Sequence, residues 1–381
     1  MAKTVDVVLL RERRKRKRRL FRFLIILAVV LFGALLYTSR EKWFPKLEKI
    51  GSQHANLNAE TEGEFMLTVS GGVDYHAEFV NNNLFVLCDK YIYIYDMNGE
   101  LQDSRQHAYS NAIMKTNQDK ALLYSHNGTS FRVDNSKKML FEENLDDSIW
   151  FGVLSDDGRV AIITGSETYA CCLYIYDATG KLIYTRNCLE RLIDVSFQNQ
   201  GCICATIGSE NGEVVTVLKY IQFQESDVQW TSEALPALCW HVYSMKDGGA
   251  FVIGDTKTAY YNNTGDLINS YAYNGSLIDC DFSNNQGAVL LKNESRRQSI
   301  LLLFSDSSTN PVTVYFDSIC KNVKIQDNII YLLDAGKIRS YSFTGTELSC
   351  FEINDAYEKI LKNGKYFYLL GYDRIQRMSG G

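Results

Sequence analysis

The 381-residue sequence predicts an all-β protein, an eight-bladed β-propeller, with a single transmembrane α-helix before it. Three observations predict this organisation. A basic block precedes an apolar run near the N-terminus, polar turns recur about every 40 residues, and a Tyr-Ile-Tyr-Asp segment with a Gly turn occurs twice, at 91–102 and 171–184. The composition agrees, because the chain has 24 Tyr and only 3 Pro, and aromatic residues are enriched in strands.

The N-terminal segment has the pattern of a membrane anchor. Residues 1–50 hold 14 Lys and Arg against 4 Asp and Glu, which leaves 26 against 41 for the rest of the chain. Residues 20–37 are apolar or small apart from Arg22, and about 17 to 20 such residues suffice to cross a bilayer core. Because basic residues mark the cytoplasmic side, we predict a cytoplasmic tail at 1–19, a transmembrane helix at 20–37 and an extracytoplasmic remainder.

A basic block before an apolar run also occurs in cleaved secretory signals and in nucleic-acid-binding proteins. Against a cleaved signal, the residues after Leu36 read YTSREKWFPK, with no small-residue cleavage site and no Cys for lipid attachment. Against nucleic-acid binding, membrane topology already accounts for the basic block. We therefore expect a single-pass protein of the cell membrane that contacts membrane lipid and binds no nucleic acid.

Beyond the predicted span, the chain divides into a stalk and a repeat. Residues 38–63 are polar and lack periodicity, which predicts an extracytoplasmic stalk. From 64 to 381, a polar turn precedes an apolar run eight times, at Asn82, Asp119, Asp157, Gln200, Asp247, Gln286, Asp327 and Asn363. Units of about 40 residues with four short strands are propeller blades.

Each unit has an expected internal order. The apolar run would be the second strand and the Tyr/Ile run the third. DMNGEL, DATGKL, NNTGDL and SFTGTEL would then turn into the outermost strand through Gly99, Gly180, Gly265 and Gly345, since tight hairpins require Gly. We expect every blade to use this hairpin. The last unit stops after its third strand, so residues 65–69, FMLTV, are expected to supply the missing strand and close the ring.

One of these turns resembles a known repeat. YDATGKLIY at 176–184 is similar to the tryptophan-docking repeat of quinoprotein-type eight-bladed propellers, with Asp177, Thr179, Gly180 and Lys181 matching and Tyr184 where that family has Trp. The layout of basic tail, span and outer propeller also resembles an uncharacterised family of membrane-anchored propellers from Gram-positive anaerobes. That resemblance implies topology and no particular activity.

The chain carries no complete catalytic or cofactor motif. The quinoprotein resemblance implies a vicinal disulfide, a Ca²⁺ site and an Asp base. Cys171 and Cys172 are vicinal, but in a strand their side chains point to opposite faces, so we expect buried thiols and no cofactor. The five His form no zinc pattern, and no nucleophile elbow or phosphate loop occurs. No residue is nominated as catalytic, so the sequence favours a protein that is not an enzyme and leaves an enzyme as the alternative.

A set of acidic turns is the first candidate binding face. The turn between the second and third strands carries a carboxylate in seven blades and His126 in blade 2. Two interpretations are open: Asp simply favours turns, or the carboxylates form a ring at one channel mouth that attracts a cationic partner or Ca²⁺. The seven residues are Asp89, Glu167, Glu210, Asp255, Glu294, Asp334 and Asp373.

The second candidate is the loop TSEALPALCWHVYSM at 231–245, with Trp240 and His241. Aromatic residues are enriched at interfaces, whereas alternation of Leu238, Trp240 and Val242 favours core packing. From these features we predict a binding or scaffold module of the cell envelope whose partner is an envelope protein or glycan. The alternative is an envelope enzyme, either a degenerate quinoprotein or a glycan-processing propeller.

Overall fold

A computed structural model of the chain describes residues 65–69, 75–293, 295, 297–306, 309–354 and 356–380. These residues belong to one compact unit, Asn58–Gly381. The predicted tail, span and stalk lie outside the described residues, as does Glu294. Within the described part of the chain, no helix is long and apolar enough to cross a membrane.

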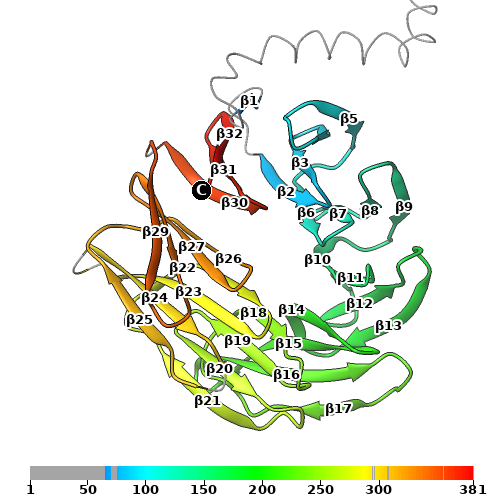
Figure 1. Ribbon diagram of the computed structural model, residues 1–381. Coiled ribbons are helices and arrows are strands. Elements are labelled where there is room, and N and C mark those ends of the chain that lie inside the picture. Colours follow the sequence, from blue (N-terminus) through cyan, green and yellow to red (C-terminus); the bar gives the residue numbers. More distant parts are fainter. Residues whose placement is uncertain are drawn as a thin grey trace, which may run out of the picture. The chain divides into compact units, whose positions relative to one another are not determined.

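The described strands form eight four-stranded antiparallel sheets, which follow one another around a central axis (Figure 1). We number the blades 1 to 8 from the sheet that begins with β2. The innermost strands are β2 (His76–Val80), β6 (Ala112–Thr116), β10 (Ile149–Leu154), β14 (Arg191–Gln198), β18 (Cys239–Ser244), β22 (Ser276–Ser283), β26 (Asn322–Gln326) and β30 (Tyr357–Asn363). The second strands are β3 (Asn83–Leu87), β7 (Ala121–Ser125), β11 (Val160–Thr164), β15 (Gly201–Glu210), β19 (Ala250–Gly254), β23 (Gln286–Asn293), β27 (Ile329–Asp334) and β31 (Tyr366–Gly371).

The outer half of each blade completes the sheet. The third strands are β4 (Tyr91–Tyr95), β8 (Ser130–Asp134), β12 (Cys171–Tyr176), β16 (Glu213–Gln222), β20 (Lys257–Tyr261), β24 (Gln298–Phe304), β28 (Lys337–Tyr341) and β32 (Arg374–Ser379). The outermost strands are β5 (Leu101–Gln106), β9 (Met139–Asn144), β13 (Leu182–Cys188), β17 (Val228–Thr231), β21 (Leu267–Ala272), β25 (Val312–Phe316), β29 (Glu347–Glu352) and β1 (Phe65–Thr68). The predicted eight-bladed propeller and its strand order are confirmed.

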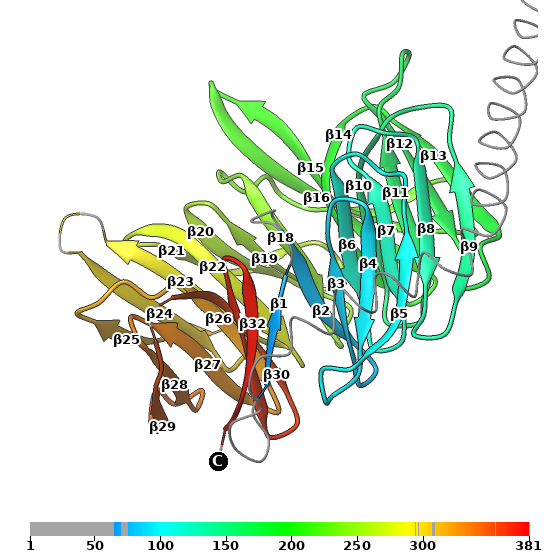
Figure 2. The same cartoon turned by 90° about the horizontal axis from the view of Figure 1, so that it is seen from above.

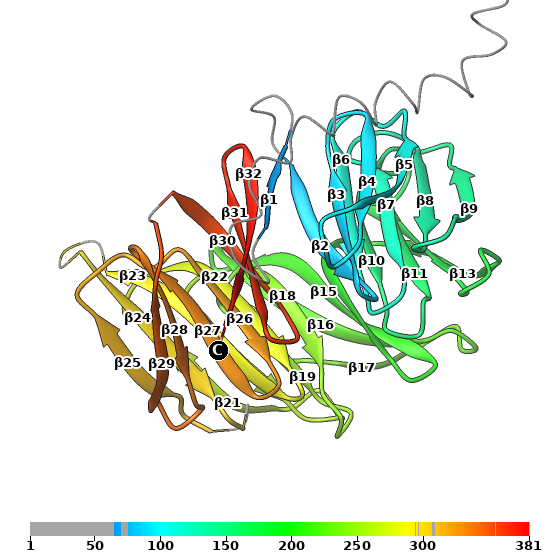
Figure 3. The same cartoon turned by 45° about the horizontal axis from the view of Figure 1, so that its top comes forward.

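Ring closure follows the prediction. Strand β1 is the fourth strand of blade 8 and pairs antiparallel with β32, with Phe65 opposite Arg377 and Thr68 opposite Arg374 (Figure 3). The N-terminal strand therefore completes the sheet built by the C-terminal end of the chain. Pairing the two ends in one blade covers the edge of β32, which would otherwise expose unpaired backbone groups.

The core is divided among the interfaces between neighbouring blades. One apolar cluster lies at each of the eight interfaces, from the blade 1–2 cluster around Phe85 and Leu123 to the blade 8–1 cluster around Leu67 and Tyr368. Because every blade packs on both faces, the second strands are largely buried, and ALLYS, VAIIT and AFVIG are buried throughout. This explains why the second strands are continuous apolar runs and do not alternate.

The Gly hairpin occurs in alternate blades, and the expectation that every blade carries it is wrong. Blades 1, 3, 5 and 7 have a turn Gly with positive φ, at Gly99, Gly180, Gly265 and Gly345. In blades 1, 3 and 5 the Gly lies against an aromatic ring on the outermost strand of the preceding blade: Phe65, Phe141 and Trp230. The repeating unit is therefore a pair of blades, in which the even blade supplies the ring and the odd blade the Gly that admits it.

One hairpin is longer than the rest. Strands β15 and β16 have 10 residues each, and their tip projects beyond the neighbouring strands (Figure 2). Asn211 and Gly212 form the tight turn with positive φ values of 52° and 84°. The residues from Gly208 to Val214 are exposed, so this tip adds to the face described next.

Candidate functional site

Six of the seven predicted carboxylates belong to the described residues, and these six share one face of the propeller. We call it the turn face: it carries the turns between second and third strands and the connections between blades. Asp89, Glu167 and Glu210 are exposed there. His126 occupies the corresponding turn of blade 2, where its Nδ1 lies 2.8 Å from the carbonyl oxygen of Trp150.

Three of the other predicted carboxylates have partners within the protein. Asp255 accepts a hydrogen bond from the backbone N–H of Leu238 at 2.9 Å. Asp373 pairs with Arg374 at 2.9 Å. Asp334 is only 3% exposed and pairs with Arg339 at 3.1 Å. Asp334 therefore belongs to a buried network. Among the described members of the set, Asp89, Glu167 and Glu210 are the ones that the exposure pattern leaves open to a cationic partner.

Basic residues also reduce the negative charge of this face. Lys90, Arg191 and Arg374 are exposed, and each follows an acidic residue in the sequence. Opposite charges this close largely cancel at longer range. A uniform acidic ring is therefore not the pattern of the turn face, and Ca²⁺ binding by its carboxylates stays a prediction.

The second candidate, Trp240 and His241, lies at the channel end of the turn face. Trp240 is 45% exposed, so the expectation of core packing is wrong for this residue. The register of β18 against β19 shifts between Cys239 and His241, and such a bulge breaks the alternation of side chains. His241 Nδ1 lies 3.6 Å from Asp194 Oδ2, on the inner strand β14 of the preceding blade.

Large apolar side chains are exposed at several points on the turn face. Leu189 is 79% and Tyr372 75% exposed. Neither of these two side chains belongs to an interface core cluster. With Trp240, the turn-face residues of this kind are Tyr169, Leu189, Val214, Trp240, Ile319 and Tyr372. Single exposed apolar side chains are common on protein surfaces, so these six form a candidate surface only through the face that they share.

A second group of charged residues lines the central channel, and the sequence prediction did not include it. Glu78 on β2, Asp279 and Asp281 on β22 and Lys324 on β26 are half-buried. The carboxylates of β22 also link two blades: Asp279 Oδ2 accepts the backbone N–H of Val323 at 2.8 Å, and Asp281 Oδ2 accepts that of Ile325 at 2.7 Å. These bonds satisfy inner-strand amides that no neighbouring strand reaches.

The channel charges shift one another's pKa. Burial acts to lower the pKa of Lys324, but Asp281, Glu78 and Asp279 outweigh it and raise that pKa to about 12. Burial raises the pKa of Asp281, although Lys324 and backbone hydrogen bonds oppose the rise. For Glu78 burial acts upward, but His76 and Lys324 lower its pKa overall. Lys324 therefore favours the ionised forms of Glu78 and Asp281.

A signal for this group was present in the sequence. The strands that precede the polar turns read HAEFV, SLIDCDFS, NVKIQ and YEKILKN. Charged residues two apart in short strands lie on one side of the strand, and inner strands of a propeller face the channel. The prediction from sequence rested on the turns and the apolar second strands, so these inner-strand charges were not part of it.

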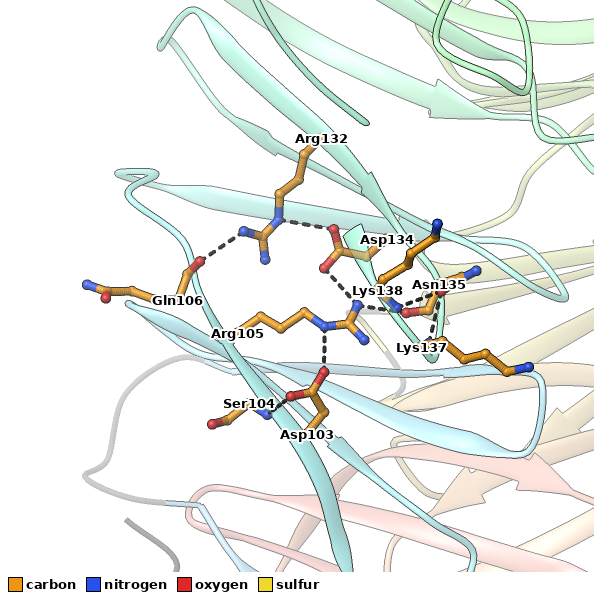
Figure 4. A network of polar contacts seen from close by, with 9 residues as sticks. All are labelled: Asp103, Ser104, Arg105, Gln106, Arg132, Asp134, Asn135, Lys137 and Lys138. Atoms are coloured by element: carbon orange, nitrogen blue, oxygen red, sulfur yellow. Dashed lines mark hydrogen bonds and ion pairs between the residues drawn. The ribbon is translucent and has the colours of Figure 1, made fainter. Parts of the chain in front are cut away.

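A buried ionic network links blades 1 and 2 (Figure 4). Arg105 Nη1 lies 3.3 Å from Asp134 Oδ2 and Arg132 Nε lies 3.2 Å from Asp134 Oδ1. Burial raises the pKa of Asp134, and the two guanidinium groups oppose that rise. The side chain of Arg132 is 6% exposed and that of Asp134 0%. This network is enclosed and connects blades, so it is not a candidate for binding a partner.

The cysteines show no cofactor arrangement. All ten are free thiols. The sulfur of Cys171 accepts the backbone N–H of Leu192 at 3.4 Å, whereas that of Cys172 donates to Asn187 at 3.1 Å. Across the described residues, no group of three or more His, Cys, Asp or Glu side chains is placed to hold a metal ion.

Comparison with known proteins agrees with the fold. A family model described as "Family of unknown function (DUF5711)" matches residues 54–379. A search of the curated proteins found no match. Among solved structures, the computationally designed Ika8 protein is similar, with a TM-score of 0.63, 13% identity and coverage of 82% of this chain and 98% of that one.

Two natural proteins are also similar in structure. Sqt1 of Saccharomyces cerevisiae has a TM-score of 0.58 and 10% identity, with 82% of this chain and 97% of that one covered. BamB of Moraxella catarrhalis has a TM-score of 0.51 and 10% identity, with 82% and 98% covered. At these identities the likeness concerns the fold.

Proposed function

We infer that this chain, which belongs to the DUF5711 family of unknown function, is a binding or scaffold module. It would recognise a protein partner through its turn face. The observation that carries this proposal is the exposure of Leu189, Trp240 and Tyr372 on that one face. Exposing such side chains to water is unfavourable, and a partner surface would cover them.

The proposed location is the outer side of a cell membrane. Eight basic residues within 11–19, followed by a run at 20–37 that is apolar apart from Arg22, support a single-pass anchor with a cytoplasmic N-terminus. The propeller would then be displayed outside the cytoplasm, where an envelope protein can approach the turn face.

Proximity labelling in cells tests the turn face directly. A labelling enzyme fused after Gly381 is expected to mark a defined set of envelope proteins with the native chain. The triple variant Leu189→Ser, Trp240→Ala, Tyr372→Ser should lose that set and keep its thermal melt, because these side chains contribute little to the core. Ile268→Ser is the matched control, since Ile268 is 52% exposed on the outermost strand β21.

The outcomes separate the alternatives. An unchanged set with the triple variant, or an equal loss with the control, contradicts the proposal. The envelope-enzyme alternative has one observation in its favour, the convergence of Glu78, Asp281 and Lys324 in the channel. If the purified chain turns over a substrate and Lys324→Met abolishes that activity, the envelope-enzyme alternative is favoured.

A further inference from the structure

An open groove lies between the outer parts of blades 6 and 7. Its volume is about 610 Å³, within the usual range of ligand sites. Strand β25 forms one wall with Val314, Tyr315 and Phe316. The other wall belongs to blade 7 and is mostly polar: Asp334, Ala335, Lys337, Arg339, Tyr341, Gly345 and Glu347.

The three equivalent interfaces are filled at this point by an aromatic ring. A Cβ built on Gly99 would lie 3.0 Å from the ring of Phe65, one on Gly180 2.6 Å from Phe141, and one on Gly265 2.8 Å from Trp230. At Gly345 the contacting group is a methyl of Val312 at 2.9 Å, and Val312 is 39% exposed. A valine covers less of the neighbouring blade than a ring does, so the outer part of this interface is left open.

Blade 7 also departs from the other odd blades in the residues that face this space. Glu347 lies opposite Tyr341 across the hairpin of blade 7. In blades 1, 3 and 5 the equivalent position holds a leucine: Leu101, Leu182 and Leu267. Arg339, two residues before Tyr341, takes the place of Tyr93, Tyr174 or Ala259. The open interface, between blades 6 and 7, is therefore the one of these four at which the ionic pair Arg339 and Glu347 stands in place of uncharged residues.

The ionic pair is held in a fixed position. Arg339 Nε donates to Asp334 Oδ2 at 3.1 Å, and its Nη1 donates to Glu347 Oε2 at 3.0 Å. The hydroxyl of Tyr341 donates to the same carboxylate at 2.8 Å. The hydrogen bond from Tyr341 and the charge of Arg339 lower the pKa of Glu347, so this carboxylate is ionised at neutral pH. The Arg339 side chain is 27% exposed, which leaves part of the guanidinium open to the groove.

We propose that this groove binds a neutral glycan chain. A carboxylate beside a guanidinium accepts a hydrogen bond from one sugar hydroxyl and donates one to the next. Three carboxylates, Asp317, Asp334 and Glu347, stand against Lys337 and Arg339, so there is no excess of positive charge for an anionic ligand. Val314 and Phe316 on the opposite wall add an apolar side to the groove.

A peptide fits this groove less well. Peptide recognition relies on apolar side chains that enter apolar pockets or on a groove lined by apolar residues. The blade 7 wall instead presents charged and hydroxyl groups along most of its length. The groove reaches the turn face at Asp317, Ser318, Asp334 and Ala335. It contains none of Leu189, Trp240 and Tyr372, so the two proposals are tested through different residues.

Binding is measured on the full chain in detergent by saturation-transfer NMR and calorimetry, with cellohexaose, chitohexaose and mannohexaose as neutral probes. An oligogalacturonate of equal length is the anionic probe. A peptide with the sequence of residues 226–234, which contains Trp230, is the polypeptide probe. We expect at least one neutral hexasaccharide to bind and the other two kinds of probe to bind more weakly.

Two groove variants and a control complete the test. Arg339→Tyr with Glu347→Leu introduces the residues found in blade 3 and should lower affinity about tenfold or more. Val312→Phe fills the groove and should also weaken binding. Lys219→Ala, at a smaller groove of about 170 Å³ between blades 3 and 4, should change nothing. The proposal is overturned if no neutral probe binds at millimolar concentration, if the peptide or the anion binds best, or if both groove variants bind as the native chain does.

Discussion

The interfaces between blades 2 and 3 and between blades 6 and 7 occupy equivalent positions in the two-blade repeat, yet their contacts differ. At the blade 2–3 interface, Phe141 lies over Gly180 at the outer edge and packs edge-on against Phe131, with ring centroids 6.3 Å apart. At the blade 6–7 interface, Val312 replaces the ring, and Asp279 and Asp281 bond to the inner strand of the next blade.

The blade 4–5 interface shows that these contacts are independent. There Asp194 accepts the backbone N–H of Val242 at 2.8 Å near the axis, and Trp230 still covers Gly265 at the outer edge. An inner-strand link therefore does not prevent an aromatic ring farther out. The open edge at blades 6 and 7 is a local feature of that interface, and this local character makes it a candidate site.

The largest expected effect concerns the ring seam, where Phe65 fills the outer edge between blades 8 and 1. Deleting residues 62–70 removes strand β1 and leaves β32 without its partner. We expect a loss of about 4 kcal/mol or more in unfolding free energy, or aggregation, because several buried side chains are lost with an exposed edge. Thermal and denaturant melts measure it, with deletion of 41–58 as the control that should melt as the native chain does.

A smaller effect separates the filled interface from the open one. Gly180 has φ +92° and Gly345 φ +80°, so valine is strained at both, at about 1–3 kcal/mol each. At Gly180 the new Cβ also meets the ring of Phe141 at 2.6 Å, whereas at Gly345 it meets a methyl of Val312 at 2.9 Å. Gly180→Val should therefore destabilise more than Gly345→Val in denaturant melts. Equal losses would show that the two interfaces are packed alike at this point.

The smallest effect tests the axis of the blade 6–7 interface through pH. The folded pKa of Lys324 is raised to about 12, so its contribution to stability is present below about 10.5 and is lost as pH rises through about 12. Lys324→Met should cost about 2 kcal/mol near pH 8. Without this cation the pKa values of Glu78 and Asp281 rise. The stability cost of Lys324→Met should therefore shrink as pH falls and both carboxylates become protonated. A loss that is independent of pH between about 5 and 8 would contradict the proposed coupling.

Local patterns sufficed for most of the fold. Polar turns with Asn or Gly before apolar runs located the second strands, because such turns need positive φ, as at Asn81 and Gly158. The spare strand at 65–69 was identified as the closing strand by counting strands in the last unit. The pairing of blades was missed, since the contact of Phe141 with Gly180 joins residues 39 apart in the sequence.

The sequence by itself determined the propeller, its closure and the turns on which seven carboxylates lie, since hydrophobic periodicity and turn chemistry are local properties. Only the tertiary structure decided which of those carboxylates are available, because Asp334 is removed from solvent by Arg339 and Ser318, which come from separate segments of the chain. It also decided that Trp240 is exposed, through a bulge that periodicity does not register. The channel charges and the open groove depend on side chains that meet across blades, and such distances exist only once the ring has formed.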